Sequence, residues 1–483
     1  MFELEVLPPV TQVRELDTSA LVDAMGASAR LEAATAARRL AAIAELFDRR
    51  LHEVDADQRE QWLIDGHEQV TAEVACALRI SRARAAALIR VAVALHERLP
   101  QTAAKFALGL VDYRVLTVLV ARTELILDDA DVATLDTVVA RQVHRWNRLS
   151  RKKLTDAIDT CVLDIDRLAK KPTRTPADDR EIGIGPDRDG NAEIWGTVAA
   201  PDAIAFDTRL NTLADSVCPQ DPRPKARRRA DALGALAAGA TTMACHCGRP
   251  DCPTLTAPAP PQPEVVITVL SDPAAGTGYL PGYGVLSEQA LAAIAERATK
   301  QLQLAHPGEH SDPEPGYRPS AALTAFVRAR DLTCRFPGCD APAQVCDIDH
   351  TVAWPHGPTH PSNLKILCRR HHLLKTFYTG PRWWKDTQRH DGTILWTSPT
   401  GHTYRTKPHG ALLFPSLTRS TGHLDLPAAP PPKPGRGHAM PTRPTTRTQQ
   451  RAYRINYERT QNAQHEALNR ALNPEPPPEP PPF

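Results

Sequence analysis

The sequence predicts a mainly α N-terminal domain with a small β segment, followed by a C-terminal α+β domain pinned by zinc. Three observations support this prediction. The stretch from Thr18 to about Asp166 is rich in Ala and Leu, with apolar residues at the three- and four-residue spacing of amphipathic helices. Residues 180–198 instead alternate around an Asp-Gly-Asn turn, as a β-hairpin does. Cys and His pairs between Cys334 and His371 have the layout of a zinc site.

The chain has 483 residues, which exceeds the usual size of one domain. We predict four segments from the changes in composition along it. They are a mainly helical domain at 1–305, a Pro/Gly/Glu linker at 306–319, a compact α+β domain at 320–415 and a Pro-rich, disordered tail at 416–483. Within the tail, Gln449–Leu472 can form a lone helix.

Composition narrows the class of protein. The formal net charge is only +2, so any affinity for nucleic acid must come from local basic patches. The first residues include acidic side chains and lack the apolar core of a signal peptide, and no apolar run reaches the length of a membrane span. We therefore expect a cytoplasmic protein without membrane contact, in which clustered cysteines are reduced and bind metal.

Within the helical domain, Glu73–Ala92 has the pattern of a helix–turn–helix. Ser81 is placed to cap the second helix, and Arg82, Arg84 and Arg90 would face a phosphate backbone or a DNA groove. Ordinary packing in a helical bundle produces the same pattern, so both interpretations stay open. The helical domain can also join protomers into a homo-oligomer.

Residues 245–252 read CHCGRPDC and place Cys245, Cys247 and Cys252 close together. They can form a second zinc knuckle, alone or with a distant residue such as Cys218. A loop of reduced thiols is the alternative. After a Pro-rich stretch, the β-branched run Val265–Leu270 predicts a strand, and Ser287–Gln303 predicts a helix.

The densest cluster of candidate ligands lies in the α+β domain. It comprises Cys334, Cys339, Cys368 and His371, two pairs about thirty residues apart, the usual layout of a tetrahedral zinc site on a knuckle and a helix start. Cys346 is a further thiol, which we expect to be buried and free. Beyond this cluster, residues 382–406 predict a β-meander with a small core that includes Trp384 and Trp396.

A second set, Asp349, His350, Asn363 and His372, lies between or beside these ligands. Folding around zinc would bring its members together. On a strand, the adjacent Asp349 and His350 would point to opposite faces. Hydrolysis of a phosphodiester requires a base that takes a proton from water and a hard cation near the phosphate, and the set supplies groups for both. The alternative is a purely structural zinc ribbon in which these are ordinary loop residues.

The second set resembles the His-Asn-His (HNH) nuclease motif. In that family a zinc-pinned β-hairpin and a helix, the ββα-metal fold, present the site. The resemblance implies that His350 is the general base and that Asn363 orients it. It also implies that Asp349 and His372 bind a catalytic divalent ion, Mg²⁺ or Mn²⁺. The C-x4-C spacing of Cys334 and Cys339 and a His as fourth zinc ligand depart from commoner patterns.

The N-terminal part has a family resemblance of its own. Its order is a long Ala-rich helical region, a short β segment, a Cys-x-Cys loop and a strand followed by GYGVLSEQALAAIAE. This order resembles the domain of unknown function 222 of the 13E12-repeat proteins of actinobacteria, which carry an HNH nuclease at the C-terminal end. The resemblance covers roughly residues 20–410.

Together the two resemblances imply a metal-dependent endonuclease, a hydrolase that cleaves phosphodiester bonds in DNA. Its cofactors would be a structural Zn²⁺ and a catalytic Mg²⁺ or Mn²⁺. Four basic residues surround the proposed site and are expected to contact phosphates: Arg335, Arg369, Arg370 and Lys375. The rival interpretations are a non-catalytic, zinc-containing nucleic-acid-binding protein, such as a regulator or a mobile-element partner, and an RNA-directed nuclease.

Overall fold

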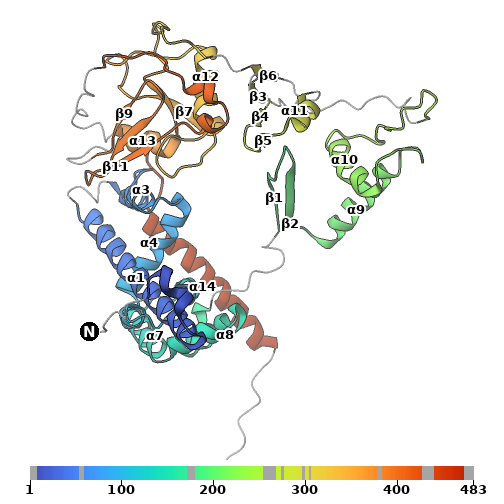
Figure 1. Cartoon of the computed structure of the whole chain (residues 1–483). Coiled ribbons are helices and arrows are strands. Elements are labelled where there is room, and N and C mark those ends of the chain that lie inside the picture. The colour runs from blue at the N-terminus through green and yellow to red at the C-terminus, as the bar shows by residue number, and fades with distance from the viewer. Residues whose placement is uncertain are drawn as a thin grey trace, which may run out of the picture. The chain divides into compact units, whose positions relative to one another are not determined.

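A computed structural model describes residues 8–53, 59–170, 180–253, 268–272, 277–295, 300–303, 306–377, 383–426 and 440–472. The chain divides into two compact units (Figure 1). Unit 1 comprises Met1–Thr173, Gly308–His409 and Arg419–Phe483, and unit 2 comprises Arg174–Pro307 and Gly410–Thr418. The structure therefore divides the predicted helical domain at 1–305 near residue 173.

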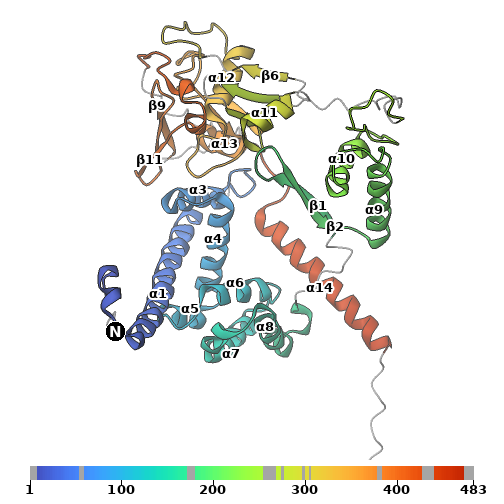
Figure 2. The same cartoon turned by 45° about the vertical axis from the view of Figure 1, so that its right-hand side comes forward.

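The first part of unit 1 is a helical bundle, in which α1 and α4 lie side by side (Figure 2). Its helices are α1 (Thr18–Leu51), α3 (Gly66–Leu78), α4 (Arg82–Glu97), α5 (Pro100–Ala107), α6 (Tyr113–Arg122), α7 (Asp129–Gln142) and α8 (Arg151–Ile165). Fully buried aliphatic side chains, among them Val115, Leu116 and Leu119, form its core. Asp or Ser side chains cap several of the helices, as Asp65 does for α3 and Ser81 for α4.

Helices α3 and α4 form the helix–turn–helix that the pattern at Glu73–Ala92 predicts. Arg79 ends α3 in the left-handed conformation, with φ of 55°, at the position where a glycine is usual. Ser81 Oγ then accepts a hydrogen bond from the backbone N–H of Arg84 at 3.4 Å. The predicted cap is thus confirmed.

The second part of unit 1 contains a β-hairpin that leads directly into a helix, and a β-meander. Its elements are α12 (Ala321–Asp331), β7 (Cys346–His350), β8 (Leu364–Cys368), α13 (Arg369–Phe377), β9 (Lys385–Gln388), β10 (Ile394–Thr397) and β11 (Thr403–Thr406). Strands β7 and β8 pair antiparallel, and β10 lies between β9 and β11. Trp384 and Trp396 are buried beside Phe336, which confirms the predicted meander and its aromatic core.

The segment predicted as a linker packs against this second part. The N–H of Glu314 donates to the carbonyl oxygen of Thr359 at 2.9 Å, and Nε2 of His360 lies 3.1 Å from the carbonyl oxygen of Ser311. The Glu314 carboxylate also accepts hydrogen bonds from Ser320, the N-cap of α12. Residues 308–319 therefore belong to unit 1 rather than to a free linker.

The prediction of a disordered tail is wrong for residues 416–426, where Leu417 and Thr421 are buried, and for residues 440–472. The helix predicted at Gln449–Leu472 is present, but it is not a lone helix. Helix α14 (Arg447–Leu472) lies against the bundle, where Ile455 is buried in the same apolar core. Nη1 of Arg459 donates to the carbonyl oxygen of Leu125 at 2.9 Å, and Nδ2 of Asn462 to that of Leu168 at 2.8 Å. The helix is thus held by one apolar anchor and side-chain hydrogen bonds. Residues 427–439 and 473–483, also part of that prediction, lie outside the described residues.

Unit 2 contains a two-stranded hairpin, a pair of helices that lie side by side (Figure 2), and a four-stranded sheet with one short helix. The elements are β1 (Glu181–Pro186), β2 (Ala192–Thr197), α9 (Ala200–Ala214), α10 (Lys225–Ala237), β3 (Thr268–Asp272), β4 (Thr277–Leu280), β5 (Gly284–Leu286), α11 (Glu288–Ala295) and β6 (Lys300–Gln303). The β1–β2 hairpin confirms the prediction for residues 180–198.

Two predictions for the four-stranded sheet need comment. The helix predicted for Ser287–Gln303 is wrong at its end, because residues 300–303 form β6, which pairs parallel with β3. The strand predicted for Val265–Leu270 begins at Thr268 in the structure, and residues 265–267 lie outside the described part of the chain.

Candidate functional site

Four predicted metal ligands meet in the second part of unit 1. Cys334 and Cys339 lie in the loop after α12, Cys368 ends β8, and His371 is in the first turn of α13. The ligand atoms of these four residues all lie within 4.8 Å of one another. The Nδ1 atom of His371 is 3.5 Å from Sγ of Cys334 and 3.3 Å from Sγ of Cys368. Three thiols and one imidazole in this arrangement could hold a metal such as zinc.

Neighbouring groups orient His371 and shift the pKa values of the thiols in this cluster in both directions. The ring of Phe336 stacks on His371, with centroids 4.0 Å apart and an interplanar angle of 12°, and so sets the orientation of the imidazole. Hydrogen bonds from the thiols of Cys334 and Cys339 lower the pKa of Cys368. Burial raises the pKa of Cys334. Cys346, the further thiol, is buried and free as predicted.

The hairpin beside this cluster carries the second predicted set. Asp349 and His350 end β7, Asn363 immediately precedes β8, and His372 follows His371 on α13. Asp349 lies opposite Lys365 and His350 opposite Leu364 in the β7–β8 pair. The structure therefore places the second set on one hairpin and the helix that follows it, which also carry Cys368 and His371 of the first set.

The imidazole of His350 is buried and has a defined hydrogen-bond partner. Its Nε2 atom lies 2.9 Å from the hydroxyl oxygen of Thr359, and that hydroxyl donates to the carbonyl oxygen of Gly316 at 2.6 Å. A hydroxyl has one hydrogen, so Thr359 must accept from an Nε2–H, and this leaves the lone pair of His350 on Nδ1. Burial lowers the pKa of His350 and favours the neutral ring. Tyr317 stacks on the ring at a centroid distance of 5.3 Å.

Asn363 is fully buried and holds the loop that follows His350. Its Nδ2 donates to the carbonyl oxygens of Val352 and Pro358 at 3.0 and 2.9 Å, and its Oδ1 accepts from the N–H of Val352 at 2.9 Å. The loop also requires a glycine at 357. A Cβ there would lie 2.3 Å from the Val352 carbonyl oxygen and 2.6 Å from Nδ2 of Asn363. Sequence reasoning did not single out Gly357 or Thr359.

Several charged side chains surround the carboxylate of Asp349. Its Oδ2 lies 2.7 Å from Nζ of Lys365 and 2.6 Å from Nζ of Lys375. Burial would raise the pKa of Asp349, but the charges of Lys365, Lys375 and His372 outweigh burial and lower it. Lys365 also lies 2.6 Å from Asp386, so two carboxylates and two ammonium groups form one buried network.

The other oxygen of Asp349 faces His372. Oδ1 of Asp349 and Nε2 of His372 are 3.5 Å apart, and Nδ1 of His372 lies 3.0 Å from Oδ2 of Asp347. When Nδ1 carries the proton and donates to Asp347, the lone pair of Nε2 points toward Asp349. A carboxylate behind an imidazole is the usual arrangement that orients a metal-binding histidine.

The structure corrects two of the four predicted phosphate contacts. Arg335 is buried, with Nη1 2.9 Å from Oδ1 of Asp331 and Nη2 donating to the carbonyl oxygen of Thr406 at 2.9 Å. Its guanidinium stabilises the core and is not available to DNA. Lys375 is largely enclosed and bound to Asp349 and to the carbonyl oxygen of His350.

Arg369 and Arg370 keep accessible guanidinium groups, with side chains that are 61% and 50% exposed. Arg370 also pairs with Glu68 of α3 at 3.0 Å. Of the four predicted phosphate contacts, these two therefore remain possible on geometric grounds, and their role stays a prediction.

Comparison with known proteins places the chain in a family. A family described as "Domain of unknown function (DUF222)" matches residues 27–331, more than half of the sequence. The chain belongs to the DUF222 family. This confirms the predicted resemblance of its N-terminal part, although the DUF222 match itself ends before Cys334 and carries no activity.

Relatives of this DUF222 protein come from Mycobacterium tuberculosis. "Uncharacterized protein Rv3776" of strain H37Rv is 44% identical over 95% of this chain and 93% of its own length. "Uncharacterized protein Rv2100" of the same strain is 43% identical over 96% of this chain and 91% of its own. No solved structure matches the chain. Within the residues that the structure describes, no helix combines the length and apolar character that a membrane span needs.

Proposed function

We propose that this DUF222 protein is a metal-dependent endonuclease that hydrolyses phosphodiester bonds in DNA. The observation that carries the proposal is the presence of two features on one hairpin and the helix that follows it. His350 is neutral, and its Nδ1 lone pair is free of the hydrogen bond to Thr359. The side chains of Asp349 and His372 face each other. A general base and a place for a cation are the two requirements of phosphodiester hydrolysis.

Each residue of the site has a separate task in this mechanism. His350 takes a proton from the attacking water at Nδ1. Thr359 accepts the Nε2–H and so holds the tautomer that leaves Nδ1 free. Asn363 fixes the loop behind His350 through its hydrogen bonds to Val352 and Pro358. Because Thr359, Asn363 and Val352 are buried, the base is held in one orientation before substrate arrives.

The donors at Asp349 and His372 fit a divalent cation. A carboxylate oxygen and an imidazole nitrogen suit Mn²⁺, and the carboxylate suits Mg²⁺. Asp347 would hold His372 with its Nε2 turned toward the ion. A divalent ion bound there would stabilise the negative charge that develops on the phosphate and the leaving oxygen. Lys375, 2.6 Å from Asp349, adds a positive charge on the same side.

Zinc would have a different task in the same domain. Cys334, Cys339, Cys368 and His371 supply four protein ligands, which fills a tetrahedral site and leaves no position for water. We therefore assign this site to structural Zn²⁺. The ion would join the loop after α12 to the start of α13, the helix that carries His372, and so position the catalytic set.

A non-catalytic nucleic-acid-binding protein is the second candidate, and one observation favours it. Lys365 and Lys375 already neutralise Asp349, so a divalent ion must compete with two ammonium groups for that carboxylate. In this alternative the zinc-held fold binds nucleic acid through exposed side chains such as Arg369, and the hairpin network is only structural.

Nicking of supercoiled plasmid by the purified full chain, with Mg²⁺ or Mn²⁺ and with or without chelator, separates the two candidates. His350→Ala should lower the nicking rate by roughly two orders of magnitude or more, as expected for the loss of a general base. His356→Ala is the matched control, because this histidine lies exposed in the same loop, and it should nick like wild type.

Zinc content and helicity should stay unchanged in His350→Ala, since His350 is not a ligand of the Cys/His cluster. Full nicking activity in that variant would refute the mechanism, and a loss of zinc would show that His350 is structural. Wild-type protein that binds DNA but nicks it with neither metal would favour the second candidate. A labelled RNA of the same sequence, tested in parallel, identifies the substrate.

A further inference from the structure

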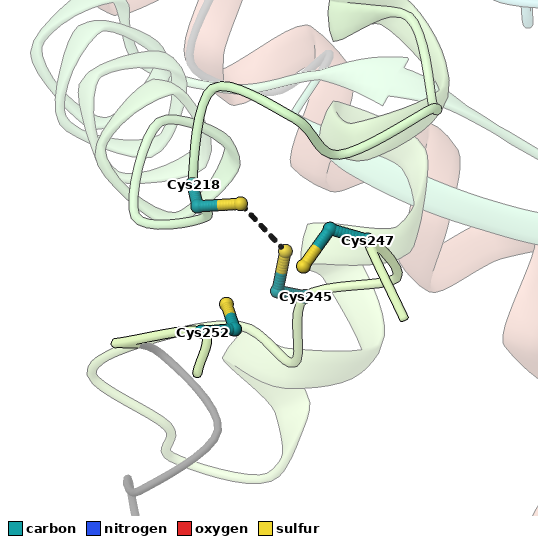
Figure 3. A group of neighbouring side chains, drawn as sticks. All are labelled: Cys218, Cys245, Cys247 and Cys252. Atoms are coloured by element: carbon teal, nitrogen blue, oxygen red, sulfur yellow. Dashed lines mark hydrogen bonds between the residues drawn. The ribbon is translucent and has the colours of Figure 1, made fainter. Parts of the chain in front are cut away.

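Unit 2 contains a second group of candidate ligands, remote in sequence from the hairpin site. Cys218 follows the end of α9, and Cys245, Cys247 and Cys252 lie in the loop after α10. Figure 3 shows their four sulfur atoms turned toward one another from these two segments. Sγ of Cys218 is 3.4 Å from Sγ of Cys245, and all four sulfur atoms lie within 4.8 Å of one another.

These distances match a tetrahedral thiolate site. With zinc–sulfur bonds of about 2.3 Å, two ligands of a tetrahedron are separated by about 3.8 Å, which falls inside the observed range. None of these four cysteines is joined in a disulfide. Cys218, Cys245 and Cys252 are buried and Cys247 is half-buried, so the group is shielded from solvent on most sides.

The ligand set is four cysteines and excludes the nearby histidine. His246 lies between Cys245 and Cys247 in the sequence, but its side chain is exposed and it is not part of the sulfur group. Its backbone N–H instead donates to Oδ2 of Asp221 at 2.9 Å. The fourth member of the group is therefore the distant Cys218, as one of the predicted alternatives had it, and not His246.

Hydrogen bonds hold the two ligand-bearing segments together. Asp221, three residues after Cys218, forms an ion pair with Arg223 at 2.8 Å, and the same guanidinium donates to the carbonyl oxygen of Ala244 at 2.8 Å. The N–H of Met243 donates to Oγ of Ser216 at 2.9 Å. The residues on either side of Cys218 are thus tied directly to the residues that precede Cys245, which orients the first ligands of both segments.

The surrounding core is small. The cysteines share it with a few apolar side chains in α9 and α10 and in the segments just after them: Leu210, Leu213, Val217, Ala232 and Met243. A core of this size contributes little stability, and thiols that face one another make poor hydrogen bonds. Binding a metal would satisfy all four sulfur atoms at once, and its binding energy would become folding energy.

We propose that Cys218, Cys245, Cys247 and Cys252 form a structural zinc site in unit 2. Four thiolates complete the coordination shell, so no position remains for water or a substrate. The site would fasten the end of α9 to the loop after α10, and it is independent of the proposed nuclease activity.

The zinc content of the purified full chain, measured by mass spectrometry of the metal, tests this proposal. Wild type should hold two zinc ions per chain, and Cys218→Ser and Cys368→Ser should hold one each. The double variant should hold none. Cys161→Ser is the matched control, because Cys161 is a buried lone thiol in α8, and it should retain two ions.

A second measurement covers the case in which Cys218→Ser does not fold. Wild-type protein titrated with a mercurial reagent that releases zinc from thiolates should free two ions per chain. Tryptic cleavage between residues 200 and 253 should accelerate as they leave. Replacement by Co²⁺ should give two sets of tetrahedral absorption bands, of which Cys368→Ser removes one. One zinc per wild-type chain, a Cys218 disulfide, or iron with visible absorption in this site would overturn the proposal.

Discussion

Replacing Glu68 by Gln tests how the site helix is attached to the bundle. Glu68 lies in the first turn of α3 and is only 5% exposed. Its carboxylate accepts hydrogen bonds from three arginines of other helices: from Nε of Arg82 on α4 at 2.9 Å, from Arg370 on α13 at 3.0 Å and from Arg447 on α14 at 2.7 Å. One negative charge therefore connects the helix of His371 and His372, the C-terminal helix and the bundle. Gln keeps the size of the side chain and removes that charge.

The expected cost follows from the electrostatics of the site. Burial would raise the pKa of Glu68, but hydrogen bonds and charge from Arg82 and the charges of Arg447 and Arg370 lower it from 4.5 to about 2. A pKa difference of this size corresponds to about 3 kcal/mol in favour of the charged form. The three arginine side chains are 36–50% exposed, so water can solvate them once the carboxylate is gone. We expect Glu68→Gln to lower the free energy of unfolding by about 1–3 kcal/mol at neutral pH.

The effect should depend on pH with a defined sign. A carboxyl whose pKa is depressed by folding contributes stability above its unfolded pKa of 4.5, and this contribution disappears as pH falls toward about 2. The difference between wild type and Glu68→Gln should therefore shrink over that range. Denaturant unfolding at several pH values measures it, and hydrogen exchange should show faster opening of α13 and α14 at neutral pH.

Glu466→Gln is the matched control for this experiment. Glu466 pairs with Arg470 on the exposed side of α14, where the arginine side chain is 74% exposed, so the change should cost less than about 0.5 kcal/mol. Equal stability of Glu68→Gln and wild type at neutral pH would refute the reasoning. A difference that persists unchanged at the acid end would show that the lost energy is not that of the charged pair.

Two further predictions concern side chains whose surroundings the structure defines. Arg335→Ala should lower the free energy of unfolding by about 3 kcal/mol or more, because it leaves Asp331 buried with one partner fewer. Arg369→Ala should leave the free energy of unfolding unchanged and reduce the salt dependence of DNA affinity. Thermal unfolding and binding at several salt concentrations compare the two, and the opposite pattern would restore Arg335 as a DNA contact. Ile455→Asp should release α14 from the bundle, which would be seen as protease cleavage within residues 447–472. Tyr453→Asp, on the exposed side of the same helix, should not cause this cleavage. Equal resistance of both variants to the protease would show that the apolar anchor is unimportant.

Local patterns explain which parts of the fold were predictable. The β1–β2 hairpin, the β9–β11 meander and the cap at Ser81 depend on neighbours within a few residues, so the sequence alone is sufficient for them. The ligands Cys334, Cys339, Cys368 and His371 were also predictable, because their pairs have a characteristic spacing and the hairpin between them is short.

The remaining features depend on contacts between distant segments. Residues 300–303 continue a helical pattern, yet they pair with β3, about thirty residues earlier, and no local signal reports such a parallel partner. The local sequence of Arg335 is that of a surface residue, but contacts with Asp331 and with the carbonyl oxygen of the distant Thr406 hold its guanidinium in the core. Cys218 becomes the partner of Cys245 only when α9 and α10 pack. For α14, the helix itself was predicted, but its packing against the bundle through Ile455 was not, because that contact joins segments far apart in the sequence.

The packing of the α3–α4 turn limits how this protein can use its helix–turn–helix. In proteins that read DNA with this motif, the N-terminal end of the second helix enters the major groove. Here the loop that carries Cys334 and Cys339 packs against the turn between the two helices. The thiol of Cys76 donates to the carbonyl oxygen of Pro337 at 3.8 Å, and a Cβ at Gly338 would lie 2.8 Å from the Ile80 carbonyl oxygen. Arg82, which would have to reach the bases, is bound to Glu68. Bundle packing therefore accounts for Arg82, whereas Arg84 and Arg90 keep exposed side chains as the helix–turn–helix pattern predicts, and a role of these two in DNA binding stays a prediction.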